Sequence, residues 1–249
     1  MAASAIEWTE VTWNPTTGCD RVSPGCDHCY AQTLAKRLKA MGQPKYQRDG
    51  DPRTSGPGFG ITVHPDTLID PFSWTGSRLV FVNSMSDLFH DGISDDFIRR
   101  VVDVMCATPQ HTYQVLTKRP RRLLAISEQI DWPPNVWLGV SVESQRYAFR
   151  VEQVGRVAAG VRFVSAEPLL GPLELPLGGI SWVIVGGESG AAPRPIDVEW
   201  VRSLREQCLD AGVPFFFKQW GGRTPKAGGR ILDGRTWDEM PVPAQLVGG

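Results

Sequence analysis

The 249-residue chain lacks a long hydrophobic run and an excess charge of either sign. A membrane-spanning helix needs about 20 predominantly apolar residues, and no stretch approaches that length, so we expect no membrane association. The first eight residues have neither a cationic start nor an apolar run, so we expect no signal peptide and a cytoplasmic location. The formal net charge of −1 shows no general basic excess, which leaves only a local basic patch for binding nucleic acid.

Repeats at the periods of solenoid proteins are also absent, and the odd count of five cysteines excludes complete pairing into disulfides. Three of the five, Cys19, Cys26 and Cys29, fall within eleven residues. In a cytoplasmic protein, crowded cysteines favour metal or cluster ligation over disulfides.

The cysteine spacing, Cys-x6-Cys-x2-Cys, allows two kinds of metal site. Three thiolates can hold three irons of a [4Fe–4S] cube and leave the fourth iron open to a small molecule. Alternatively, the cysteines and one histidine would close a tetrahedral zinc site, with His28, His64 and His90 as the available histidines. The cysteines alone leave both interpretations open.

Short apolar segments alternate with helical patterns along the chain. The segments predicted as strands are 79–82, 112–116, 136–142, 161–165, 182–185 and 214–217, with a weaker one at 11–13. The segments predicted as helices are 31–41, 95–106, 121–130, 145–157 and 198–211. This alternation predicts an α/β fold with a parallel sheet.

We expect a full or partial (β/α) TIM-like barrel of six to seven parallel strands, in a single domain spanning 1–249. A doubly wound open sheet is the alternative. Nearly every predicted strand ends in polar or charged residues, as in barrels whose active sites lie at the carboxyl ends of the strands. The segment 42–78, rich in Gly and Pro, is predicted to be an irregular insertion or lid, and 221–249 a C-terminal extension.

The cysteine motif resembles that of the radical S-adenosylmethionine superfamily, whose usual Cys-x3-Cys-x2-Cys signature follows the first strand of a partial barrel. Here six residues, rather than three, separate Cys19 from Cys26. More narrowly, the chain resembles a phage-associated family of unknown function. The strings that carry this resemblance are NPTTGCDRVSPGCDHCYA, SMSDLFH, VLTKRP, GVSVES, SAEPLLG, GGESG and FFFKQWG.

The resemblance implies an iron–sulfur enzyme with a [4Fe–4S] cluster, S-adenosyl-L-methionine and a cellular reductant. Such an enzyme generates a 5′-deoxyadenosyl radical that abstracts hydrogen from a substrate. The substrate is unidentified; a nucleotide or nucleic acid, in phage-related modification or repair, is the class considered. The alternative function is a zinc-stabilised, non-catalytic binding or host-interaction module.

The resemblance also implies roles for individual residues. Cys19, Cys26 and Cys29 would hold the cluster. The residues expected to bind S-adenosylmethionine are Ser84, Ser86 and Asp87 after one strand and Ser141 and Glu143 after another. For Asp87, a helix or turn cap is the competing interpretation.

The later strand ends supply Glu167, Glu188 and Lys218, which we expect to act on the substrate as catalytic residues. A Glu–Lys salt bridge that closes the barrel mouth is the alternative. The basic residues of the TKRPRR segment are expected to bind a carboxylate or phosphates, or else to form a solvated turn: Lys118, Arg119, Arg121 and Arg122.

Overall fold

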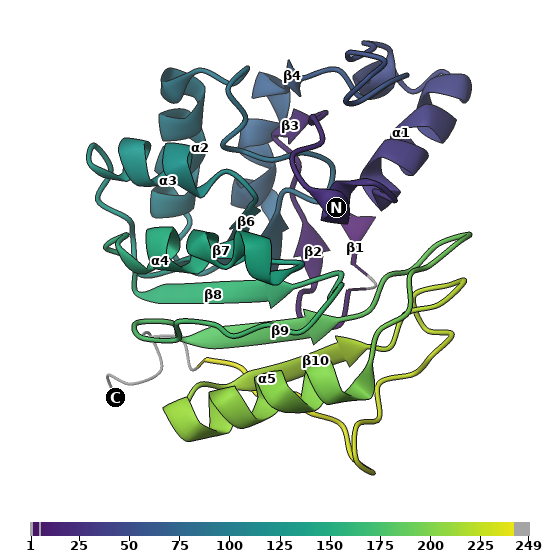
Figure 1. Ribbon diagram of the computed structural model, residues 1–249. Coiled ribbons are helices and arrows are strands. Elements are labelled where there is room, and N and C mark those ends of the chain that lie inside the picture. The colour runs from purple at the N-terminus through teal and green to yellow at the C-terminus, as the bar shows by residue number, and fades with distance from the viewer. Residues whose placement is uncertain (1, 5, 242–249) are drawn as a thin grey trace.

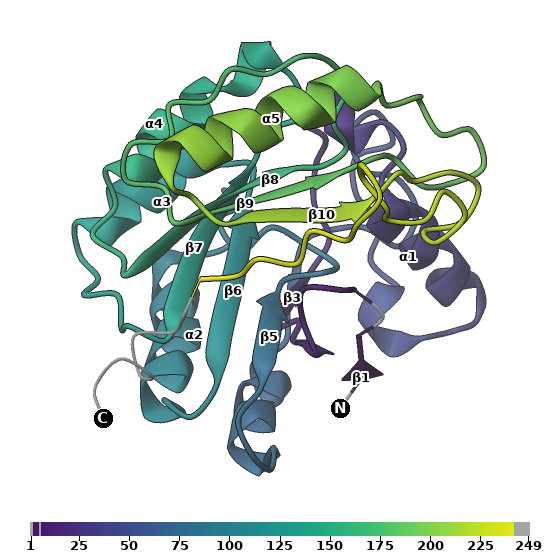
Figure 2. The ribbon, with the colours of Figure 1, turned by 90° about the horizontal axis from the view of Figure 1, so that it is seen from below.

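The computed structural model describes residues 2–4 and 6–241, and its centre is one curled sheet. The strand order is β1-β2-β5-β6-β7-β8-β9-β10; β1 is antiparallel to β2, and the other seven strands are parallel. Their bounds are Ala2–Ala3, Val11–Thr12, Leu79–Val82, Thr112–Thr117, Val136–Ser141, Val161–Ala166, Trp182–Gly186 and Phe215–Gln219. The sheet curls into a half-barrel (Figures 1 and 2), which confirms the predicted partial α/β barrel.

The helices are α1 to α5, with bounds Tyr30–Ala40, Asp95–Ala107, Pro120–Ser127, Phe149–Gly155 and Val198–Ala211. Helix α2 begins where the Ser94 hydroxyl accepts a hydrogen bond from the Phe97 N–H, and acidic residues occupy its first turn. Helix α5 ends at Gly212, whose φ of +64° is the left-handed conformation that favours glycine. The predicted helix 145–157 is shorter than expected, because a separate 3-10 turn, Gln145–Tyr147, precedes α4.

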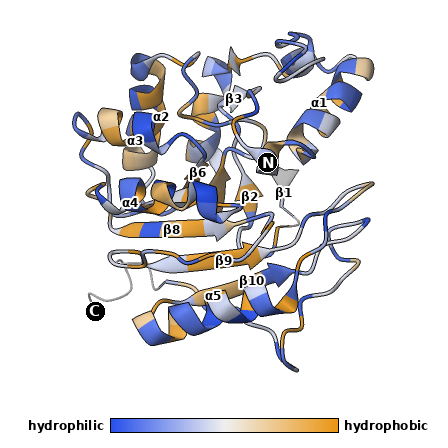
Figure 3. Ribbon diagram, in the orientation of Figure 1, coloured by the Kyte–Doolittle hydropathy of each residue, from blue (hydrophilic) through white to orange (hydrophobic). Residues whose placement is uncertain are grey.

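Successive strand residues face opposite sides of the sheet and build two apolar clusters. Val183 and Val185 of β9 pack with residues of α2 to α5 in the larger cluster. Trp182 and Ile184 belong to the smaller, aromatic cluster on the other face, which Trp8 joins. Burial on both sides explains why strands such as β9 are hydrophobic along most of their length (Figure 3), whereas the helices carry both kinds of residue.

Two less regular segments border the sheet. The insertion contains β4 (Thr62–Val63), which pairs with β3 (Thr16–Thr17), and the 3-10 helices Pro44–Tyr46 and Pro65–Ser73. The described part of the extension, 221–241, lies along β10, where the Phe217 N–H donates to Trp237 O at 2.9 Å; residues 242–249 lie outside the described residues.

Among the described residues, no helix is long and apolar enough to cross a membrane.

Candidate metal and cofactor site

The three cysteines line one cavity of about 160 Å³ at the carboxyl end of the half-barrel. Cys19 follows β3, Cys26 ends the 3-10 turn Pro24–Cys26, and Cys29 directly precedes α1. The cavity is also lined by residues that follow β5 and β6 and by the last residue of β7: Asn83, Ser84, Ser86, Asp87, Lys118, Arg119 and Ser141. In the part of the chain that the structure describes, no three His, Cys, Asp or Glu side chains gather around one ion position. The ligand role of the cysteines therefore stays a prediction.

Two glycines let the cysteine loop pack closely against its neighbours. Gly18 has a φ of +88°, and a Cβ atom there would lie 2.3 Å from Gly60 O, so only glycine fits. A Cβ atom on Gly25 would lie 3.3 Å from Cδ of Glu143. The loop thus lies directly on the insertion at one end and on the segment after β7 at the other.

The cavity wall disfavours free thiolates at two cysteines. Burial raises the pKa of the Cys19 thiol, and the Asp87 carboxylate raises it further, while Arg119 opposes this. Burial also raises the pKa of the Cys29 thiol. Hydrogen bonds from backbone N–H groups at the start of α1 and the charge of the Lys118 ammonium lower this pKa, but burial outweighs them. Because metals bind the thiolate form of cysteine, a metal bound at these residues would displace their protons.

Asp87 and the two serines before it bond to the protein itself. Asp87 Oδ1 accepts hydrogen bonds from Thr117 Oγ1 at 2.7 Å and Phe89 N at 3.0 Å, and its Oδ2 accepts one from Lys118 N at 3.0 Å. The residue thus joins the loop after β5 to the end of β6. This arrangement supports the turn-cap interpretation of Asp87.

The hydroxyls of Ser84 and Ser86 contact the segment that follows β2. Ser84 Oγ bonds with Asn14, and Ser86 Oγ lies 2.6 Å from Thr16 Oγ1. Both serines line the cavity. Their predicted contact with a cofactor therefore requires an additional or exchanged hydrogen bond.

Ser141 and Glu143, expected to act together, are separated by the structure. Ser141 lines the cavity, and its hydroxyl has no hydrogen-bond partner among the described residues. Glu143 is not among the lining residues; it is completely buried, and Arg150 of α4 donates to its Oε2 at 3.1 Å. The Glu143 carboxylate lies beneath the cysteine loop, next to Gly25, and its contact with a cofactor stays a prediction.

The three expected substrate residues also have partners. Lys218 Nζ lies 2.8 Å from Glu167 Oε1, which is the Glu–Lys pair considered as the alternative. Glu188 is 6% exposed and bonds with Arg194 and with Nδ1 of His28, the latter at 2.9 Å. None of the three lines the cavity. Glu188 instead connects the loop after β9 to the cysteine loop.

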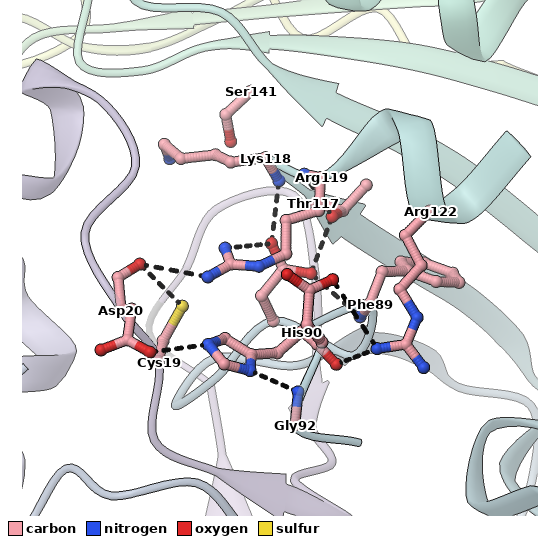
Figure 4. Close-up of polar contacts among 12 residues, drawn as sticks. Cys19, Asp20, Phe89, His90, Gly92, Thr117, Lys118, Arg119, Arg122 and Ser141 are labelled. Atoms are coloured by element: carbon pink, nitrogen blue, oxygen red, sulfur yellow. Dashed lines mark hydrogen bonds and ion pairs between the residues drawn. The ribbon is translucent and has the colours of Figure 1, made fainter. Parts of the chain in front are cut away.

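The basic TKRPRR segment divides into bound and unpaired residues (Figure 4). Arg119 donates to Asp20 O at 3.4 Å and lies 4.0 Å from Asp87 Oδ2. Arg122 pairs with Asp95 at 2.8 Å and donates to two backbone carbonyls. Lys118 lines the cavity, and its ammonium has no hydrogen-bond or ion-pair partner within the described ranges.

Sequence reasoning missed three residues of this region. Asn83 lines the cavity, is 4% exposed, and has a buried Oδ1 without a partner among the described residues. Tyr30 closes part of the mouth by donating from its hydroxyl to Ser84 O at 2.6 Å. Asn83 could have been found from its position directly after a predicted strand. The residues around Arg194 contain no pattern that predicts its contact with Glu188.

A parallel half-barrel with three cysteines and polar strand ends around one cavity defines an α/β protein with a candidate metal and cofactor site. A family model described as "Protein of unknown function (DUF5131)" matches residues 3–241, and the chain belongs to this family. No curated protein matches the sequence.

Among solved structures, spore photoproduct lyase complexed with dinucleoside spore photoproduct is similar at 12% identity and a TM-score of 0.43. That match covers 79% of this chain and 60% of the other. A cysteine-to-serine mutant of spore photoproduct lyase matches at 12% identity and a TM-score of 0.44, over 83% of this chain and 64% of the other. The chain thus spans about 60% of the length of the first of these structures.

Proposed function

We propose that this protein is a radical S-adenosylmethionine enzyme whose [4Fe–4S] cluster is held by Cys19, Cys26 and Cys29. The observation that carries the proposal is that these three cysteines line one cavity at the carboxyl end of a parallel half-barrel. Three thiolates suit a cube with one open iron. When bound, the cluster and its cofactor supply a 5′-deoxyadenosyl radical that abstracts hydrogen from a substrate.

The donors of this cavity fit the polar groups of S-adenosylmethionine. Asn83 Oδ1, a buried acceptor without a partner in the described chain, suits the methionyl amino group. The unpaired Lys118 ammonium suits the carboxylate, and the Ser141 hydroxyl suits a ribose hydroxyl. Ser84 and Ser86 line the same cavity as Asn83, and we propose that they also contact the cofactor.

The cavity must widen to admit the cofactor. Sites for molecules of drug size typically measure about 300–1,000 Å³, more than the roughly 160 Å³ found here. We propose that the insertion, 42–78, is the lid that moves: Phe59 lines the cavity, and Thr54 O accepts a hydrogen bond from Arg21 N at 3.0 Å. Glu167 and Lys218 are proposed to face the substrate after their ion pair exchanges partners.

Anaerobic reconstitution with iron and sulfide tests the proposal. We expect a brown protein that, after reduction with S-adenosylmethionine present, releases 5′-deoxyadenosine. Replacing Cys19, Cys26 or Cys29 with Ala should abolish iron loading, because two thiolates do not hold the cube stably. Cys106→Ala is the matched control, since Cys106 is exposed on α2 and outside the cavity.

The alternative function, a zinc-stabilised binding module, predicts a colourless protein with one zinc per chain. Of the three candidate histidines, His28 leaves Nε2 without a partner among the described residues, whereas His90 uses both ring nitrogens, for Asp20 and for Gly92 N. His64 Nε2 is likewise bonded to Thr17, at 2.9 Å. Stoichiometric zinc without 5′-deoxyadenosine formation would overturn the radical enzyme in favour of this module.

A further inference from the structure

Cations are distributed unevenly in this nearly neutral chain. The segments 28–48, 104–127 and 211–232 contain no Asp or Glu and carry five, four and four Lys or Arg residues, half of the 26 in the chain. Segments 104–127 and 211–232 contain the ends of β6 and β10 and the residues that follow them, and segment 28–48 contains α1, which begins directly after Cys29. Although the net charge is −1, half of the basic residues thus lie in three acid-free segments, and two of them, Lys118 and Arg119, line the cavity.

Most of these cations lack a side-chain partner in the described ranges, 2–4 and 6–241. Eight have no side-chain hydrogen bond or ion pair among the described residues: Lys36, Arg37, Lys45, Arg48, Lys118, Arg121, Arg223 and Lys226. Outside these segments fewer cations lack such a partner in the described chain: Arg202 and Arg205 of α5 both bind Asp233, whereas Arg100 and Arg156 have none. Unpaired cations on one side of a protein attract a polyanion, because each phosphate they bind releases condensed counterions.

Hydrogen bonds through Glu188 connect the cysteine loop to the loop after β10. His28 bonds with Glu188, and Glu188 O accepts a hydrogen bond from Gly222 N at 2.9 Å. Arg223 directly follows and is exposed. Both ribbon views place the loops after β9 and β10 at the same end of the sheet as α1 (Figures 1 and 2). Cations thus lie on two sides of the cavity mouth.

The exposed face of α1 combines apolar and basic side chains. Tyr30, Leu34 and Met41 are 56%, 38% and 70% exposed, and with Arg37 they follow the i, i+4, i+7, i+11 spacing of one helix face. Single-stranded nucleic acid is bound by such combinations, with bases stacked on aromatic rings and phosphates near cations. A helix of 11 residues is about 16 Å long, longer than one nucleotide needs.

We propose that this surface binds single-stranded nucleic acid and delivers one nucleotide to the cavity. The inference rests on the proposed function for the reaction at the cavity, but the binding itself requires neither cluster nor cofactor. The first contacts are Lys36 and Arg37 on α1 and Arg223 and Lys226 after β10.

Fluorescence anisotropy with a labelled 20-nucleotide single strand, and with the duplex of the same sequence, tests the proposal. Two double variants each remove two cations, Lys36→Gln with Arg37→Gln and Arg223→Gln with Lys226→Gln. The logarithm of the binding constant falls linearly with the logarithm of the salt concentration. If both cations of a pair contact phosphates, their removal makes this slope for single strands less steep by about 1.4, which corresponds to about 25-fold weaker binding at 0.1 M salt. The matched control, Arg100→Gln with Arg156→Gln, removes two exposed cations on and after the outer helices α2 and α4 and should change affinity less than twofold.

The proposal would be overturned if the two double variants lost no more affinity for the single strand than the control variant. Tighter binding to the duplex than to the single strand would also overturn it. Binding only to acidic vesicles, to an acidic peptide or to a free mononucleotide would also overturn it. Failure of the proposed function is distinguishable, because release of 5′-deoxyadenosine is measured separately on reconstituted wild-type protein. Binding without that release leaves the surface supported and the radical chemistry refuted; release without binding refutes the surface alone.

Discussion

Replacing Glu188 with Gln tests how the loop after β9 holds the cysteine loop. The Glu188 carboxylate accepts hydrogen bonds from N and Nε of Arg194 and bonds with Nδ1 of His28, each at 2.9 Å. Arg194 also donates to Pro24 O at 2.9 Å. Because Pro24 and His28 lie on either side of Cys26, loss of the carboxylate charge loosens the loop that carries the proposed ligands.

The size of the effect follows from the pKa of Glu188. Burial alone raises this pKa, but hydrogen bonds from Arg194 and His28 outweigh burial and lower it from 4.5 to about 2. At about 1.36 kcal/mol per pKa unit, the ionised group stabilises the fold by about 3 kcal/mol. A lowered pKa stabilises the folded state above pH 4.5, and that contribution is lost as the pH falls through about 2. Between about pH 7 and pH 3, more than half of it disappears.

Urea unfolding of both proteins at pH 7 and pH 3 measures this contribution. We expect Glu188→Gln to lower the free energy of unfolding by about 3 kcal/mol at pH 7 and by less than half of that at pH 3. Iron loading should fall in parallel. Glu199→Gln on α5 is the matched control, because its side chain is 69% exposed and its pair with Arg202 is a surface pair of little energetic weight. An equal effect at both pH values, or one no larger than the control, would refute the reasoning.

Three other substitutions test the packing around the site. Gly18→Ala should cost several times more stability than Gly42→Ala, because a Cβ atom meets Gly60 O at 2.3 Å in the first case and nothing within 4 Å in the second; thermal unfolding compares them. Asp87→Asn should cost about 1–3 kcal/mol in urea unfolding, since an amide offers one acceptor oxygen where two are used. Gly139→Ala should cost about 1–3 kcal/mol, because its Cβ would lie 2.4 Å from the Phe163 ring; unchanged melting would contradict that overlap.

Local pattern in the sequence was enough to predict most of the fold. The predicted strands 79–82, 112–116 and 182–185 agree with β5, β6 and β9 to within one residue at either end. Apolar runs buried on both faces and helix signals such as Ser94 and Gly212 are properties of neighbouring residues. Polar residues directly after the strands were sufficient to predict that Ser84 and Ser141 would meet at one cavity.

The sequence by itself determined the alternation of strands and helices, the crowding of three cysteines after the first parallel strand, and the clustering of cations in acid-free segments. Only the tertiary structure decided which charged side chains have partners within the protein and which are left to bind a ligand. Glu188 bonds with His28 across 160 positions, Glu143 lies under the cysteine loop, and Arg119 is held while Lys118 is unpaired. The physical reason is that strand and helix periodicity depend on near neighbours, whereas the partner of a charged side chain depends on which distant segments the folded sheet brings within hydrogen-bond distance.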